Sequence, residues 1–279
     1  MIEISSTPNL DDSYRVPALE KGLDVLEHLA GSADAFTLKE LSEQLERTSQ
    51  ELFRVVNTLL LRGYLLRDAA GRYRTSMKLF EMGNRQAATQ ALVARAMPHM
   101  ERLAETTGES CHLSIVVQDR MLVVTRAECA ADVKISVRVG ATYDMHLRVS
   151  GRVALAWMPA ERRADYWKRH PESQSNESSI EAELARIREQ GFEAADSPII
   201  VGGQDFAAPV VSGGEVLAVL CMSRLSRVGE ASQRSEFAAA VARSAASISA
   251  EFGNPEAGLV PLPASAEVEK RSRRKSAVR

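Results

Sequence analysis

The sequence of 279 residues predicts an α+β protein with two domains, a small helical domain with a β-hairpin followed by a larger domain with a mostly antiparallel sheet. Three observations predict this class. The length suits two hydrophobic cores, residues 15–75 show three amphipathic helical patterns and a hairpin, and later segments alternate irregularly between strand and helix. The remaining boundaries follow from composition: a flexible N-terminus at 1–14, a helical connector at 76–107, the larger domain at 108–253 and a disordered basic tail at 254–279.

Composition places the chain among ordinary globular proteins, with 45% hydrophobic and 26% charged residues. Its three cysteines, Cys111, Cys129 and Cys221, are far apart, which favours a reducing compartment and argues against a disulfide framework or a zinc ribbon. The sequence has no apolar run of the roughly 20 residues that a membrane helix needs, and the first residues lack a signal-peptide pattern. We therefore expect a cytoplasmic protein without membrane contact.

The second and third helices each begin with a capping box. Thr37 precedes Glu40 by three residues, and Thr48 precedes Glu51 in the same way. Only two residues separate the second helix from the second cap, so the two helices must cross sharply, as in a helix-turn-helix.

A hairpin follows the third helix. Gly63 suits the left-handed position at the end of that helix, and residues 64–67 and 72–75 flank a turn that contains Gly71. Three helices and such a hairpin predict a winged helix.

The distribution of charge favours DNA as the partner of this domain. Residues 15–46 have three basic and seven acidic side chains, a net charge of −4, whereas residues 47–78 have seven basic and two acidic side chains, a net charge of +5. A positive surface on the third helix and the hairpin suits the phosphate backbone. The alternative is that Arg54, Arg72 and Arg74 form an ordinary solvated face.

The third helix also carries the side-chain types that contact base edges in the major groove. Phe53 lies off its core stripe, where it either contacts a thymine methyl group or packs against the hairpin. The candidate residues for binding double-stranded operator DNA are Arg47, Ser49, Gln50, Phe53, Arg54, Asn57, Arg72 and Arg74.

In the larger domain, residues 111–117, 121–127 and 215–224 are typical of strands, and helices are expected at 150–158, 181–190 and 232–252. Cys111 and His112 would face opposite sides of a strand, as a buried thiol and a partly exposed imidazole, and so could not form a catalytic pair. The five histidines show no metal-binding spacing, and we find no catalytic residues and no cofactor motif.

Several motifs, in order and at matching spacing, resemble the IclR family of bacterial transcriptional regulators. The resemblance covers roughly residues 16–252. It includes PALEKGLDVLEHLA, TLKELSEQL, Leu61-Arg62-Gly63-Tyr64, Gly71-Arg72-Tyr73-Arg74, Met77-Lys78-Leu79, Gly140 with Met145-His146, Ser150-Gly151-Arg152, Gln190-Gly191-Phe192 and Ala207-Ala208-Pro209-Val210.

The resemblance implies a winged helix-turn-helix domain joined to a GAF-like effector-binding domain. It also implies homodimers or homotetramers that bind operator DNA under the control of a small molecule, often an organic or aromatic acid. By the same resemblance, the positions of Met145, Asp205, Cys221 and Ser223 line the effector cavity.

The chain departs from the family pattern at charged positions, including Asp144, Arg148 and Arg224. We hypothesise that Arg148 or Arg224 pairs with a ligand carboxylate while Asp205 accepts a hydrogen bond from a ligand hydroxyl. The alternative is that Arg148 forms a surface ion pair with Asp144.

The sequence thus predicts a regulator that is not an enzyme and in which the connector transmits ligand binding to the winged helix. Pro98 should break or kink the helix of that connector. The alternatives are a small-molecule enzyme and a protein-assembly module, each carrying a winged helix that does not bind DNA.

Overall fold

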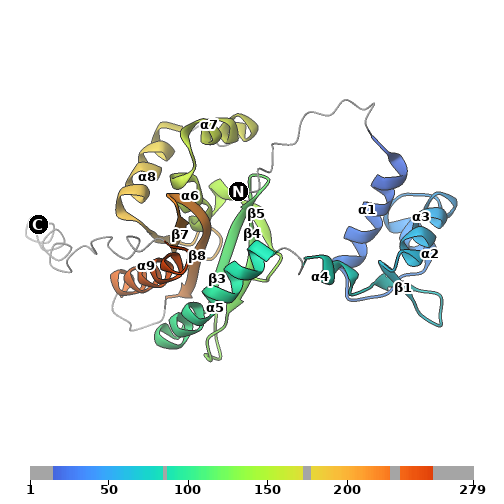
Figure 1. The fold of residues 1–279 in the computed structure, drawn as a ribbon, viewed down its shortest axis with the longest axis horizontal. Helices are drawn as coiled ribbons and strands as arrows, with labels where there is room; N and C mark the ends of the chain where they lie inside the picture. The colour runs from blue at the N-terminus through green and yellow to red at the C-terminus, as the bar shows by residue number, and fades with distance from the viewer. Residues whose placement is uncertain (1–14, 84–86, 172–176, 227–232, 254–279) are drawn as a thin grey trace, which may run out of the picture. The chain divides into compact units, whose positions relative to one another are not determined.

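The computed structural model describes residues 15–83, 87–171, 177–226 and 233–253. It divides into two compact units, Met1–Gln90 and Ala91–Arg279, and Figure 1 labels most of their elements. The N-terminal segment 1–14 and the basic tail 254–279, which we expected to be flexible, lie outside the described residues.

The first unit is a three-helix domain with a hairpin. Its elements are α1 (Pro17–Ala30), α2 (Leu38–Gln44), α3 (Ser49–Leu61), β1 (Leu65–Arg67) and β2 (Tyr73–Thr75), followed by α4 (Lys78–Gly83). One side chain or more from each of the first five elements enters a single core, which consists of Val25, Leu29, Leu41, Leu52, Val56, Leu65 and Tyr73. This arrangement confirms the predicted winged helix.

Local signals in the sequence position these helices as predicted. Both capping boxes are present, so the hydroxyl oxygens of Thr37 and Thr48 accept hydrogen bonds from the backbone amides of Glu40 and Glu51. At the end of α3, Gly63 has the predicted left-handed conformation, with φ of 75°. The turn between β1 and β2 is held by Asp68, whose carboxylate accepts hydrogen bonds from backbone N–H groups within the turn.

The helix α5 (Ala87–Thr107) follows α4 and continues through Pro98. Of the two predicted outcomes at Pro98, the break is wrong, and the kink stays a prediction. Proline removes one hydrogen bond from the helix, but buried Ala96 and Met100 flank it and pack into the same core, which holds both halves of α5 in place.

The second unit is built on a six-stranded sheet with the order β5-β4-β3-β8-β7-β6, in which every neighbouring pair is antiparallel. The strands are β3 (Cys111–Val117), β4 (Arg120–Ala127), β5 (Thr142–Asp144), β6 (Glu193–Asp196), β7 (Gly203–Ser212) and β8 (Glu215–Leu225). The predicted α+β class with a mostly antiparallel sheet is confirmed.

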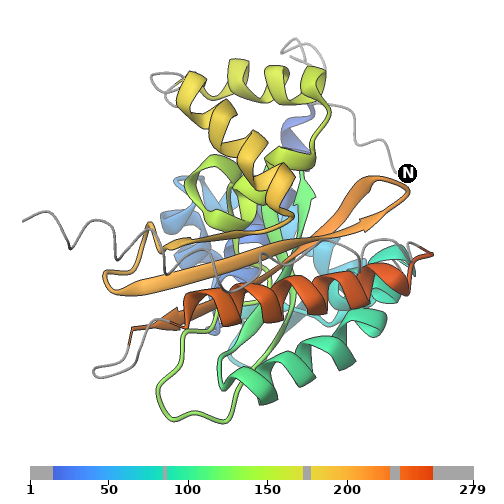
Figure 2. The same ribbon diagram turned by 90° about the vertical axis from the view of Figure 1, so that its left-hand side faces the viewer.

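Helices cover both faces of this sheet. On one face, α5 and α9 (Arg234–Ala250) lie side by side (Figure 2) and share a core with alternate residues of β3, β7 and β8. On the other face, a second core contains residues of η2 (Met145–Leu147), α6 (Val149–Trp157), α7 (Ala160–Arg169) and α8 (Glu177–Gln190). Successive residues of the central strands therefore face different cores.

Candidate nucleic-acid surface and ligand pocket

The turn between α2 and α3 sets the direction of α3. Glu46 in this turn has a left-handed backbone with φ of 51°, which reverses the chain within a few residues. Buried Leu41 on α2 and buried Leu52 and Val56 on α3 then fix which face of α3 enters the core. The opposite face of α3 is consequently presented to solvent.

That solvent face contains most of the predicted DNA-binding residues of α3. Ser49, Gln50, Phe53 and Arg54 are exposed, and Asn57 is half-buried. Phe53 is 56% exposed, which shows that the hairpin does not cover its ring. The side-chain amide of Asn57 donates a hydrogen bond to the carbonyl of Phe53, 2.9 Å away, and so is already engaged within its own helix.

The four predicted arginines are all exposed but differ in their ion pairs. Arg47 lies 3.6 Å from Asp24, and Arg72 lies 2.9 Å from Asp68. Within the described part of the chain, no acidic side chain lies within ion-pair distance of Arg54 or Arg74. Arg54 and Arg74 are thus the two arginines of the set that remain available for phosphate groups.

Glu51 is the one acidic residue of α3, and its charge is locally compensated. Its carboxylate accepts hydrogen bonds from the Lys21 ammonium, at 2.7 Å, and from the Thr48 backbone and hydroxyl. These bonds lower the pKa of Glu51 to about 2, and the bond from Lys21 has the largest effect. Glu51 therefore stays ionised while turned toward the start of its own helix.

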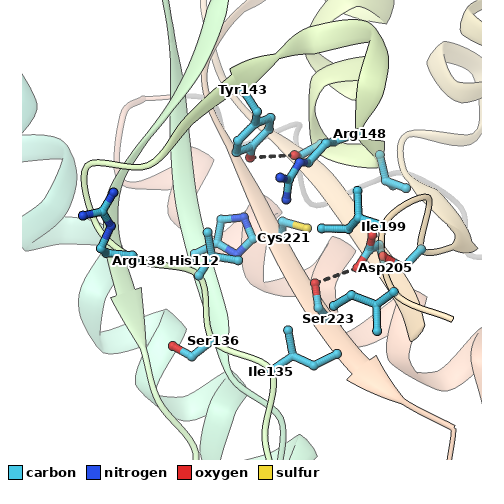
Figure 3. Close-up of a pocket in the computed structure, with 15 residues that line it drawn as sticks. His112, Ile135, Ser136, Arg138, Tyr143, Arg148, Ile199, Asp205, Cys221 and Ser223 are labelled. Atoms are coloured by element: carbon cyan, nitrogen blue, oxygen red, sulfur yellow. Dashed lines mark hydrogen bonds between the residues drawn. The ribbon is translucent and has the colours of Figure 1, made fainter. Parts of the chain in front are cut away.

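The second unit contains a pocket on the α6 face of the sheet, with a volume of about 280 Å³ (Figure 3). The residues that line it come from four strands, the start of α6 and two loops. They are His112, Ile135, Ser136, Val137, Arg138, Tyr143, Arg148, Val149, Ser150, Ser197, Ile199, Ile200, Asp205, Cys221 and Ser223. Its wall combines apolar side chains with a few polar groups, which is usual for small-molecule sites.

Arg148 supplies positive charge to this pocket. It is the N-cap residue of α6, is half-buried, and holds its guanidinium 4.5 Å from the centre of the Tyr143 ring. The predicted alternative, an ion pair between Arg148 and Asp144, is absent, because Asp144 pairs with Arg120 at 3.2 Å. The guanidinium of Arg138, the other arginine of the lining, points away from the cavity in Figure 3.

A close backbone contact positions the start of α6. A Cβ atom added to Gly151 would lie 2.1 Å from the carbonyl oxygen of Met145, so only glycine permits this approach between η2 and α6. Tyr143 strengthens the same junction, since its hydroxyl hydrogen-bonds the hydroxyls of Ser150 and Ser114 at 2.9 and 3.2 Å. The junction orients Arg148, which lies between η2 and α6.

An acidic group lines another wall of the pocket. Asp205 on β7 and Ser223 on β8 are paired across the two strands, and the Ser223 hydroxyl donates a hydrogen bond of 2.6 Å to the Asp205 carboxylate. Both side chains are buried, at 8% and 7% exposure. Burial, followed by the charge of Asp205, raises the pKa of the neighbouring Cys221 well above its usual value, so this thiol stays protonated.

Two residues of the predicted effector set lie outside the pocket. Arg224 has its side chain on the opposite face of the sheet, where the guanidinium lies 4.4 Å from the centre of the Phe237 ring on α9 and 3.8 Å from Glu109. It follows Ser223 in β8, and the strand alternation turns it away. Met145 is fully buried in the second core and does not line the pocket.

His112 was predicted to be partly exposed, and this expectation is wrong. The side chain is only 5% exposed and lines the pocket beside Cys221, its partner across the strands. The prediction that Cys111 and His112 face opposite sides is confirmed, because Cys111 belongs to the core under α5 and α9. No local pattern indicates the position of His112, because its strand partner Cys221 lies on β8, far along the chain.

Two further observations concern the described residues as a whole. No group of three or more His, Cys, Asp or Glu side chains in them could hold a metal ion. None of the helices there is long and apolar enough to cross a membrane.

Comparison with known families matches both units. The family model for the IclR helix-turn-helix domain matches residues 18–69, and the model for the C-terminal domain of the bacterial transcriptional regulator IclR matches residues 85–250. The chain belongs to the IclR family. This confirms the predicted resemblance, and IclR-family proteins are transcriptional regulators rather than enzymes.

Characterised members of the IclR family are distant relatives of this chain. The glycerol operon regulatory protein of Streptomyces coelicolor is 27% identical over 85% of this chain and 97% of its own length. The regulator BhcR of Paracoccus denitrificans is also 27% identical, over 76% of this chain and 79% of its own length. Both relatives are transcriptional regulators by name, in agreement with the family assignment.

A solved IclR homologue shows the same fold with a ligand. The crystal structure of an IclR homologue from Microbacterium hydrocarbonoxydans, complexed with 4-hydroxybenzoate, has a TM-score of 0.72 and 25% identity, and covers 85% of this chain and 99% of that one. The IclR of Thermotoga maritima, at 20% identity and a TM-score of 0.69, has the same fold. Regulators of this family bind operator DNA and small-molecule effectors.

Proposed function

We propose that this IclR-family regulator binds operator DNA through α3 and the hairpin, and that a small organic or aromatic acid in the pocket of the second unit controls this binding. The observation that carries the proposal is the presence of a solvent-facing positive surface in one unit and, in the other, a pocket whose wall combines apolar side chains with a few polar groups. A homodimer or homotetramer would present two or more such surfaces to one operator.

In the DNA-binding part of the proposal, Arg54 and Arg74 contact phosphate groups, because both are exposed and neither is engaged by an acidic side chain of the described residues. Arg47 and Arg72 have to exchange an acidic partner for a phosphate, so they contribute less. Ser49, Gln50 and Phe53 are the residues that face bases. The Ser49 hydroxyl also donates a hydrogen bond to the Ser42 hydroxyl, 3.0 Å away, which helps to align α2 against α3.

The test is footprinting on the DNA upstream of the protein's own gene, followed by affinity measurements on the protected fragment at several salt concentrations. The affinity falls as salt rises, and Arg54→Ala and Arg74→Ala should each make this fall less steep. The slope of log K against log salt should become less negative by about one for each variant. Arg243→Ala, an exposed arginine on α9, is the matched control and should leave the slope unchanged. A wild-type protein that ignores duplex DNA even at low salt contradicts the proposal.

In the effector part of the proposal, Arg148 pairs with the carboxylate of the ligand and the Asp205–Ser223 pair accepts a hydrogen bond from a ligand hydroxyl. The buried Asp205 carboxylate receives one hydrogen bond from a side chain, that of Ser223, and has further acceptor capacity toward the pocket. The apolar side chains between them, such as Ile135 and Ile199, suit a ring or a short hydrocarbon chain.

This assignment is tested by titration calorimetry with 4-hydroxybenzoate, 3,4-dihydroxybenzoate, mandelate and lactate. Arg148→Ala should reduce the affinity for the tightest-binding of these ligands by roughly tenfold to a hundredfold, the range for a lost charge-assisted hydrogen bond. Arg224→Ala, on the other face of the sheet, should leave the affinity unchanged. Equal affinities in wild type and Arg148→Ala would remove Arg148 from the ligand site.

A further inference from the structure

The pocket contains a buried histidine that the proposed effector contacts leave unused. His112 is 5% exposed, and among the residues that the structure describes, no group forms a hydrogen bond with its ring. The ring nitrogens are not among the fully enclosed polar atoms that lack a partner, so they are accessible from the cavity and open to a ligand there. In Figure 3 the ring points into the cavity, on the wall next to Cys221 and below Arg148.

We propose that His112 is a ligand-contacting residue, and that its ring takes up a proton from solvent as the carboxylate of the effector enters beside Arg148. The carboxylate is then held between two cations, the guanidinium and the imidazolium. This inference rests on the proposed function, because it requires that the effector is an anion bound in this pocket.

The surroundings of His112 keep the ring neutral while the pocket is empty. Burial, followed by the positive charge of Arg148, lowers the pKa of His112 to about 4. A carboxylate in the pocket opposes both causes, since it neutralises Arg148 and offers an acceptor to the ring N–H groups. The protonated form of His112 is therefore favoured only when an anionic ligand is bound.

The other charged and titratable groups around His112 come from β4, β5, β7, β8 and the loop with Arg138, whose guanidinium points away from the cavity (Figure 3). Arg126 on β4 is its partner across the strands and is engaged with Glu128 at 2.8 Å. On β8, Cys221 remains a thiol, and on β5, Tyr143 has its pKa raised by burial. On β7, Asp205 is bound to Ser223 on the wall assigned to the ligand hydroxyl.

The inference predicts a proton uptake that depends on the charge of the ligand. With the tightest acid of the panel, titration calorimetry at pH 6 in two buffers of different ionisation enthalpy should show uptake of roughly half a proton or more per bound ligand. The affinity should rise by about tenfold from pH 7.5 to pH 5.5. The uncharged amide of the same acid should bind without proton uptake.

Two variants locate the proton. His112→Asn and His112→Gln should abolish the proton uptake and flatten the pH dependence, while Arg224→Ala should retain both. In the wild type, the ring nitrogen signals of one labelled histidine should change from the neutral to the protonated form on saturation with the acid, a measurement that does not require a variant to fold.

The outcomes separate this inference from the proposed function. Acid binding by the wild type without proton uptake, or with the same uptake in both His112 variants, overturns the role of His112 and leaves the effector assignment standing. Failure of every acid in the panel to bind overturns the effector assignment and this inference together.

Discussion

At the scale of single residues, the pocket depends on contacts between side chains distant in the sequence. Arg148 comes from the start of α6, His112 from β3, and Asp205 with Ser223 from neighbouring strands. The register of β3, β7 and β8 brings the last three onto one face of the sheet. A change in that register by one residue would turn them toward α5 and α9.

Gly151 is the residue whose substitution should be least tolerated at this site. In Gly151→Ala, the new methyl group would overlap the backbone of Met145, so η2 and the start of α6 would have to separate. We expect a loss of about 2–4 kcal/mol in the free energy of unfolding, and weaker acid binding because Arg148 moves.

Urea denaturation followed by circular dichroism and tryptophan fluorescence measures this loss. Gly83→Ala is the matched control, since nothing lies within 4 Å of the added Cβ atom in α4. Its stability should change by less than about 1 kcal/mol. Wild-type stability in Gly151→Ala would show that the junction between η2 and α6 is not tightly packed.

At the scale of elements, α3 owes part of its stability to an ionised cap. The pKa of Glu51 is lowered to about 2 in the folded state from an ordinary value of 4.5. A carboxyl group with a lowered pKa stabilises the fold fully above pH 4.5 and loses this effect as the pH falls toward 2. Wild type and Glu51→Gln should therefore differ in thermal stability at pH 6, and this difference should narrow by pH 3.

The control for Glu51 is Glu105→Gln, which replaces an exposed glutamate near the end of α5. The difference in thermal stability between wild type and Glu105→Gln should be the same at pH 6 and at pH 3. Thr48→Ala, which removes the other half of the capping box, should reduce the free energy of unfolding by about 1 kcal/mol at neutral pH. An equal difference between wild type and Glu51→Gln at both pH values would contradict the role of the ionised cap.

The elements differ in how well the sequence predicts them. The helices and hairpin of the first unit were predicted because their signals are local: capping boxes, helical periodicity and a glycine turn. Among the strands, β5 and β6 are too short for a pattern. The long strand β7 contains Pro209, which is tolerated because β6 pairs with β7 only from Gln204 to Ala207 and leaves β8 as the neighbour of β7 at that point.

The candidate site was predictable only in part, for a related reason. The family resemblance implied Asp205, Cys221 and Ser223, and the departure from the family pattern drew attention to Arg148. Strand alternation, applied to β8, would have excluded Arg224 once Ser223 was assigned to the pocket. No local pattern identifies His112, because its position in the pocket depends on pairing with β8.

At the scale of the whole molecule, the proposed function requires a coupling free energy between the two units. An acid in the pocket should change the affinity for operator DNA by a factor of roughly 5 to 150, and bound DNA should change the affinity for the acid by the same factor. Anisotropy titrations of the operator with and without acid, and calorimetry of the acid with and without operator, measure the two factors.

Arg148→Ala provides the control for this coupling. It should bind operator DNA as the wild type does, since it lies in the second unit, and should lose the response to acid. If the acid left the DNA affinity of the wild type unchanged, the pocket would not control DNA binding.

The hydrophobic cores of the two units have no residue in common, because every member of the first core precedes residue 74 and every member of the other two follows residue 91. A chimera that exchanges the winged helix for that of another regulator would therefore leave the packing around the pocket intact. If the proposed control by an acid holds, the second unit would serve as an interchangeable sensor in engineered reporter strains, with the operator chosen independently of the metabolite.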